Sequence, residues 1–181
     1  MKLADTSLAL ALGAVVIAVG GLAAVPRAGG GPFDTLTLGM THAAALTEIR
    51  KRDRNAFPGP VCDGAYGIAA YIKHLGRTWR LLAHSDASTV DKFIVERSSR
   101  RGMASVTACA QFYADTVTRH YRARHARASW RTTGARTGDA LDIRTTAVVD
   151  PSTRLTVAVE RAAKDRALCT VRITYELIKP F

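Results

Sequence analysis

Over most of the chain, hydrophobic and polar residues alternate one by one. In the clearest case, every second residue from Cys169 to Tyr175 is apolar, and the residues between them are Thr170, Arg172 and Thr174. Because side chains point alternately to the two faces of a strand, this pattern is typical of antiparallel strands with one covered face and one face in water. The expected strands cover 66–72, 79–83, 90–97, a short strand at Trp130, 141–149, 155–159 and 169–175.

Two stretches show a different period, in which apolar residues recur every three or four positions. The first runs from about His42 to Arg52 and follows Thr41, whose hydroxyl is suited to cap a helix N-terminus. The second runs from about Met103 to His125. Its apolar face consists of Val106, Cys109, Ala110, Tyr113, Val117 and Tyr121. Each stretch predicts a helix with one side packed against strands.

The predicted elements follow the order helix, three strands, helix, four strands, which indicates an α+β fold class for residues 35–181. We expect two helix-plus-antiparallel-sheet units, one with three strands and one with four, with halves at 35–101 and 102–181. Residues 28–34 are rich in glycine and predict a linker before this domain.

An uncharged apolar run, from Leu8 to Val25, precedes the linker. As a helix it would be about 27 Å long at ~1.5 Å per residue, close to the thickness of a bilayer core. With Lys2 before it and Arg27 after it, residues 1–27 fit either a cleaved signal peptide or a retained transmembrane anchor. Either interpretation predicts a location in the cell envelope: anchored in the inner membrane and facing the periplasm, or periplasmic or secreted after cleavage.

A short motif adds a family resemblance. Leu38-Gly39-Met40-Thr41 stands immediately before the first predicted helix and its strands. In this the chain resembles the SmpA/OmlA-like bacterial envelope domains, which are associated with outer-membrane barrel assembly, and the order of its elements is similar to the β-lactamase-inhibitor-protein fold. The resemblance implies an envelope location and a binding role. Those domains are lipoproteins, whereas here no cysteine lies near the end of the apolar run, so no particular partner is implied.

The chain is strongly basic, because 26 Lys and Arg against 15 Asp and Glu give a formal net charge of +11 over 181 residues. A basic surface favours anionic partners such as an anionic lipid, a glycolipid or an acidic protein. Nucleic acid is a less favoured partner, since an exported chain rarely meets it. Hydrophobic residues make up 48% of the chain, which is ordinary for a folded domain and argues against a disordered one.

The most distinctive polar feature is a run of arginines without an acid, between the second predicted helix and the strand after it. Arginine offers a planar fork of donors that matches phosphate and carboxylate groups, so the run is a candidate anion-binding site. The alternative is a solvated helix end, where the helix dipole favours cations. The six candidates are Arg119, Arg122, Arg124, Arg127, Arg131 and Arg136.

The three cysteines, Cys62, Cys109 and Cys169, have none of the spacings of a zinc ribbon or a thioredoxin motif. Cys109 lies on the apolar face of the second predicted helix, and Cys169 on the apolar face of the last predicted strand. If that helix packs on that sheet, the two thiols come within bonding reach, and an oxidising compartment would allow a disulfide. The alternative is two separate buried thiols. Cys62 lies in a loop rich in proline and glycine and would be left over.

Little in the sequence indicates catalysis. The five histidines form no short metal-binding motif, and Gly29-Gly30-Gly31 lacks the lysine and helix of a phosphate-binding loop. His42, His74 and His84 are candidate bases for a Cys62 thiol, but no local motif links one of them to it. We therefore expect no metal site and no cofactor, and an enzymatic activity is less favoured than a binding role.

Three hypotheses follow. The first is a non-enzymatic envelope protein whose sheet or arginine run binds another macromolecule. The second is a hydrolase or thiol enzyme with a site assembled from distant residues, which a deep pocket holding a histidine beside Cys62 or a carboxylate would favour. The third is a structural subunit of an envelope complex, anchored by the apolar run.

Overall fold

The computed structural model describes residues 29–61, 65–86, 88–99, 105–162 and 168–178. The apolar run from Leu8 to Val25 lies outside these residues, so the prediction of a signal peptide or anchor depends on the sequence. In the part of the chain that is described, no helix combines the length and the apolarity that a membrane crossing requires.

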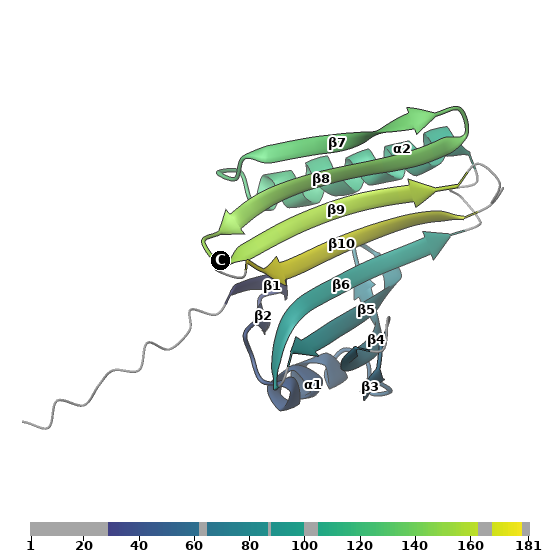
Figure 1. Ribbon diagram of the computed structural model, residues 1–181. Helices are drawn as coiled ribbons and strands as arrows, with labels where there is room; N and C mark the ends of the chain where they lie inside the picture. The colour runs from purple at the N-terminus through teal and green to yellow at the C-terminus, as the bar shows by residue number, and fades with distance from the viewer. Residues whose placement is uncertain (1–28, 62–64, 87, 100–104, 163–167, 179–181) are drawn as a thin grey trace, which may run out of the picture.

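Eight antiparallel strands form one continuous sheet in the order β3-β4-β5-β6-β10-β9-β8-β7 (Figure 1). The strands β3 and β7 are therefore its two edges. Each strand pairs with a neighbour along the chain, except that β6 and β10 pair across the middle. The strands cover Phe57–Pro60 (β3), Tyr66–His74 (β4), Arg77–Asp86 (β5), Thr89–Ser99 (β6), Trp130–Thr137 (β7), Ala140–Asp150 (β8), Thr153–Arg161 (β9) and Cys169–Leu177 (β10).

The pairing of β6 with β10 corrects the predicted fold class. The sequence predicts two helix-plus-sheet units, but Val95 of β6 lies opposite Ile173 of β10, and all eight strands share one sheet. The fold is mostly β, with this sheet, a small two-stranded sheet and two helices. The two-unit α+β prediction is wrong because alternation in a strand specifies which face is buried, not which strand lies beside it.

Alternation also fails to predict three short strands. The strand β1 (Gly29–Phe33), which lies where the glycine content predicts a linker, pairs as a hairpin with β2 (Leu36–Leu38), which follows that segment. The hairpin contacts β6 and β10, and the two leucines that bound β2 are fully buried. The strand β3 forms despite its two prolines, which an edge strand tolerates.

Both helices begin at a hydroxyl cap. Helix α1 (His42–Arg50) follows Thr41, whose Oγ1 accepts a hydrogen bond from the backbone N–H of Ala44 at 3.2 Å. Helix α2 (Val106–Asp115) follows Ser105, which caps it in the same way, and the predicted start at Met103 lies outside the described residues. The chain then continues as a π-helical segment, η2 (Thr116–Arg122).

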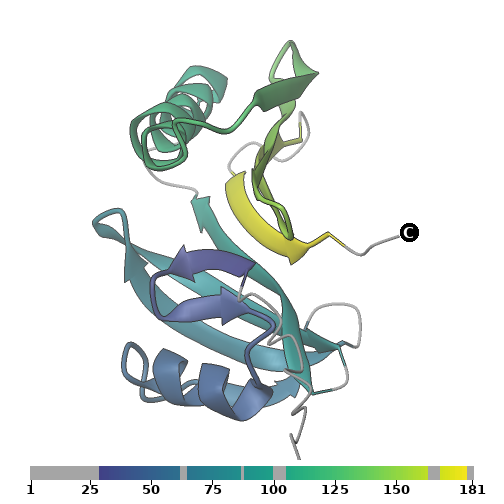
Figure 2. The same cartoon turned by 90° about the vertical axis from the view of Figure 1, so that its left-hand side faces the viewer.

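The two helices and the β1–β2 hairpin pack on the same face of the sheet, with the hairpin between the helices (Figure 2). One core fills the space between these elements and the sheet. Its largest fully buried side chains are Trp79, Tyr121, Tyr175 and Phe93. None of the described helices covers the opposite face, which we call the uncovered face.

A disulfide joins α2 to the middle of the sheet. Cys109 and Cys169 are fully buried, their Cα atoms are 5.8 Å apart, and their sulfur atoms are bonded. The bond forms because the apolar side of α2 packs on the side of β10 that carries Cys169. Cys62 lies outside the described residues.

Candidate interaction surface on the uncovered sheet face

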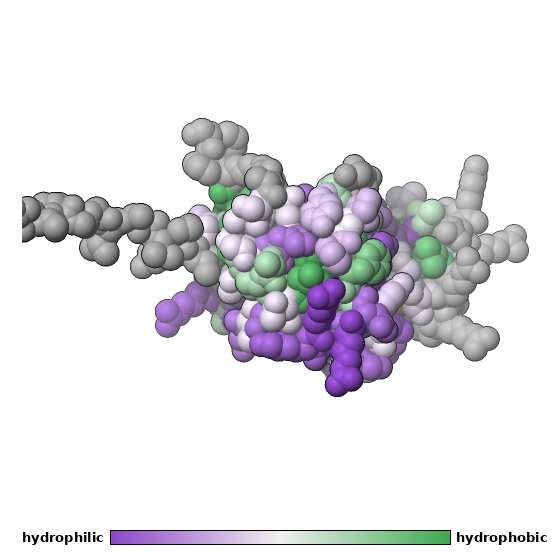
Figure 3. Space-filling model, turned by 90° about the horizontal axis from the view of Figure 1, so that it is seen from below, coloured by the Kyte–Doolittle hydropathy of each residue, from purple (hydrophilic) through white to green (hydrophobic). Residues whose placement is uncertain are grey.

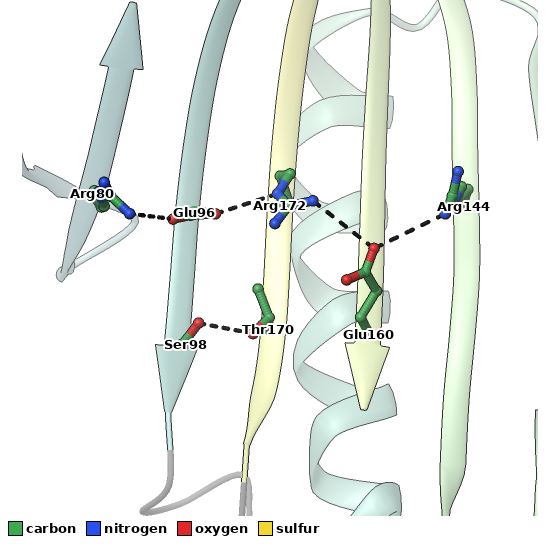
Figure 4. A network of polar contacts seen from close by, with 7 residues as sticks. All are labelled: Arg80, Glu96, Ser98, Arg144, Glu160, Thr170 and Arg172. Carbon is green, nitrogen blue, oxygen red and sulfur yellow. Dashed lines mark hydrogen bonds and ion pairs between the residues drawn. The ribbon is translucent and has the colours of Figure 1, made fainter. Parts of the chain in front are cut away.

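A row of alternating charges crosses the uncovered face from β5 to β8 (Figure 4). Arg80 Nη1 and Arg172 Nε donate to the two carboxylate oxygens of Glu96, at 3.2 Å and 3.3 Å. Glu160 continues the row, because its Oε1 lies 3.9 Å from Arg172 Nη1 and 4.0 Å from Arg144 Nη2. The strand register explains the row, since Glu96 lies opposite both Arg80 and Arg172.

In this charge row the arginines and glutamates share partners, so the row restrains side chains on the uncovered face. The side chain of Glu96 is only 16% exposed, and it holds two arginines whose side chains are about two-fifths exposed. Exposed ion pairs contribute only about 0.2–1 kcal/mol each, but shared partners restrain several side chains at once. The row therefore forms a pre-arranged polar surface across β5, β6, β10, β9 and β8.

At the β3–β4 end of the row lies a group of residues that we call the aromatic site. They line a hollow of about 390 Å³ in which two large aromatic side chains are exposed, Tyr71 to 67% and Phe57 to 56%. Figure 3 views the molecule from the end that carries α1 and β3, and it shows hydrophobic residues gathered between hydrophilic ones. The aromatic site consists of Asp53, Asn55, Phe57, Tyr71 and Arg80.

Paired backbone holds the aromatic site in place. Tyr71 lies opposite Arg80, and Phe57 lies opposite Ala69, so the two aromatic rings are diagonal neighbours on one face. The carboxylate of Asp53 accepts the backbone N–H of Tyr71 at 2.7 Å, which ties the segment after α1 to β4. A site on fixed strands loses little conformational entropy when it binds.

The aromatic site combines two exposed aromatic side chains with an arginine, an amide and a carboxylate. Aromatic side chains and arginine are enriched where proteins bind each other, and exposed large apolar groups beside polar ones mark such surfaces. No motif in the sequence marks Tyr71 as a site residue. The available signal is its position, because it occupies the outward parity of β4 between the buried residues Ala70 and Ile72. Tyr66, on the inward parity, lies at the strand end and is also exposed.

The six arginines of the candidate anion-binding run do not form one patch. Arg119 pairs with Asp115 at 3.4 Å, and Arg124 pairs with Asp34 at 2.9 Å. The remaining four are exposed. Arg122 ends η2, and Arg127 lines a hollow of about 390 Å³ with Arg124 and His125.

The last two arginines of the run lie on opposite faces of β7. Arg131 lies opposite Thr146, on the uncovered face, whereas Arg136 lies opposite the buried Leu141 and so points to the helix side. Arg136 Nε donates to the carbonyl oxygen of Gly138 at 3.3 Å. The alternation of side chains along a strand separates residues that a sequence places close together.

A buried cluster of titratable rings lies under the hairpin and η2. Nε2 of His74 and the hydroxyl of Tyr121 share a hydrogen bond of 2.9 Å, and the ring of His120 lies 5.4 Å from that of His74. Burial is the main cause that lowers the pKa of His74 to about 4, and the charges of His120 and Arg124 contribute to the same shift. His74 is therefore neutral at pH 7 and packs as part of the core.

One hollow does contain a histidine and a carboxylate. His120 and Asp115 line it together with Thr116. The Thr116 hydroxyl already donates to the carbonyl oxygen of Phe112 at 2.8 Å, and Asp115 already holds Arg119. Among the described residues, no group of three or more His, Cys, Asp or Glu could hold a metal ion. The hollow thus offers no activated nucleophile.

No protein-family model, curated protein or solved structure matches this chain.

Proposed function

We propose that the protein is a non-enzymatic binding domain of the cell envelope, which holds a protein partner against the aromatic site. The observation that supports this most directly is the exposed pair of Tyr71 and Phe57 beside Arg80, all on paired strands. Tyrosine and arginine carry much of the binding energy in protein interfaces, and rigid placement lowers the cost of association.

Binding is favoured over catalysis because the Asp53 and Asp115 carboxylates and the Thr116 hydroxyl in two of the hollows are already held by hydrogen bonds or an ion pair. Both carboxylate oxygens of Asp53 in the aromatic site accept backbone N–H groups, from Asn55 and Tyr71. In the hollow beside η2, Thr116 and Asp115 are engaged as described above. A general base needs a free lone pair directed at its substrate, and a nucleophile needs such a base.

An envelope location is supported by two independent features. The apolar run from Leu8 to Val25 has the length of a membrane crossing or of an export signal. The disulfide between Cys109 and Cys169 fits an oxidising compartment, where such bonds form and persist.

Fractionation of cells that express the full-length chain should place it in the membrane or the periplasm. N-terminal sequencing then separates the two interpretations, because an intact Met1 indicates an anchor and a start near residue 24 or 29 indicates cleavage. A soluble cytosolic product that retains Leu8 to Val25 would contradict the proposed location.

A photo-crosslinking amino acid at position 71 should give discrete protein adducts in intact envelopes, because a partner on the aromatic site would touch that side chain. The adducts are separated by electrophoresis and identified by mass spectrometry. With the partner purified, Tyr71→Ala should weaken its affinity about tenfold or more, since truncating a central tyrosine costs about 1–2 kcal/mol or more. Titration calorimetry measures the change.

Thr107 provides the matched control, because it is exposed on α2 and lies away from the uncovered face. A crosslinker at 107 should not give the adducts found at 71, and Thr107→Ala should bind the partner like the unmodified chain. Identical adducts at both positions would refute the proposal. Adducts with lipid or glycan in place of protein would also refute it.

A further inference from the structure

The two edge strands of the eight-stranded sheet differ in length and in the backbone N–H groups that they can offer to a further strand. The edge β3 is short and contains Pro58 and Pro60, which lack the N–H groups that a neighbouring strand needs. The edge β7 spans eight residues, Trp130–Thr137, and contains no proline. One side of β7 pairs with β8 along its full length, and its other side is the end of the sheet. Of the two edges of the eight-stranded sheet, β7 is therefore the longer one and the one without proline among the described residues.

A chain of hydroxyl groups holds β7 in place. The Tyr113 hydroxyl on α2 hydrogen-bonds Thr145 of β8 at 2.6 Å, and Thr145 hydrogen-bonds Thr132 of β7 at 2.8 Å. Every residue of β7 after Trp130 is exposed, so this polar chain and the backbone ladder position the strand more than apolar burial does. The edge is already paired with β8 along its full length before any partner arrives, with one positive φ of 96° at Gly134, and this pre-arrangement lowers the entropy cost of adding a strand.

The charges on β7 favour a partner of opposite charge. Arg131 and Arg136 point to opposite faces, and β7 contains no acid. Arg131 has no carboxylate partner among the described residues, and Arg136 donates to a backbone carbonyl. An antiparallel pair of two β7 strands would collect four arginines and no carboxylate, so like-charge repulsion opposes a second copy. An acidic strand would match both arginines.

We propose that β7 binds an extended, acidic segment of another protein, which adds to the sheet as a further strand. Its backbone pairs with the free side of β7, and two of its carboxylates, five residues apart and on opposite faces, meet Arg131 and Arg136. This surface lies at the other end of the sheet from the aromatic site and is independent of it.

The test uses an eight-residue peptide of alternating threonine and valine with glutamate at positions two and seven, and a second peptide with glutamine at those positions. Fluorescence anisotropy measures the affinity of each for the disulfide-intact protein. We expect the glutamate peptide to bind at least tenfold more tightly. It should also slow hydrogen exchange at the backbone amides of 130–137. Equal affinity of the two peptides, or binding without protection of 130–137, would overturn the proposal.

Charge reversal tests the same pairing from the side of the protein. Arg131→Glu with Arg136→Glu should weaken binding of the glutamate peptide at least tenfold. The control, Arg54→Glu with Lys73→Glu, makes the same change in net charge at exposed positions near the opposite edge and should change the affinity less than twofold. If both double variants lose the same affinity for the glutamate peptide, the loss is due to net charge alone and the proposal is refuted. Tyr71→Ala should bind the peptide normally, so failure here and failure of the aromatic site are distinguishable.

Discussion

Replacing Cys109 and Cys169 together by alanine should lower the free energy of unfolding by about 4 kcal/mol. The disulfide closes a loop over a sequence separation of 60. Without the bond the unfolded chain gains conformational entropy, which in the chain-entropy treatment stabilises the unfolded state by about 4 kcal/mol. Because the bond joins α2 to β10, its loss should also loosen the helix from the sheet. Urea denaturation of the protein and the double variant measures the difference.

A reductant supplies the control for this prediction. It should destabilise the unmodified protein by a similar amount and leave the double variant unchanged. Cys62→Ala should behave like the unmodified protein in both conditions, since Cys62 is not part of the bond. A double variant as stable as the parent would show that packing, and not the disulfide, holds α2 on the sheet.

Acidification from pH 7 to pH 5 should cost about 2 kcal/mol of stability through His74. The folded pKa of His74 is about 4, below its ordinary value of 6.5, so the unfolded state takes up a proton first. Stability contributed by neutral His74 is thus complete above pH 6.5 and falls as the pH drops from 6.5 towards 4. Each pKa unit corresponds to about 1.4 kcal/mol, and most carboxylates remain ionised in this window.

The variant His74→Gln tests the origin of this slope. It should be less stable than the parent at pH 7, because it disturbs the hydrogen bond to Tyr121, yet its stability should change much less between pH 7 and pH 5. A smaller slope should remain, because burial also lowers the pKa of His120 and His125. Urea denaturation at several pH values measures both slopes. If the stability of the parent and of His74→Gln falls equally between pH 7 and pH 5, groups other than His74 cause the acid sensitivity.

Local patterns predicted the elements that carry a clear period. Alternation placed six strands, β4 to β6 and β8 to β10, because each of them buries one side and exposes the other. The same reasoning placed Cys109 and Cys169 on facing apolar surfaces, where the structure joins them. Hydroxyl capping at Thr41 was equally visible, since a cap acts within one helical turn.

Features that depend on distant neighbours were not predictable in this way. The strand β1 (Gly29–Phe33) forms because β2 pairs with it and β6 and β10 contact it, whereas the local glycine content of 28–34 suggested a linker. Tyr71 lies in the aromatic site only because β3 and β5 place Phe57 and Arg80 beside it. Neither relation changes the periodic pattern of apolar and polar residues along the chain.

The sequence alone therefore established which residues share a face, the cap of the first helix at Thr41, the net charge of +11 and the apolar run from Leu8 to Val25. The joining of β6 to β10 into one sheet, the dispersal of the six arginines and the free edge at β7 became visible only in the folded chain. The physical reason is range. Side-chain periodicity acts over a few residues, whereas strand partners and exposed edges result from contacts between segments far apart along the chain.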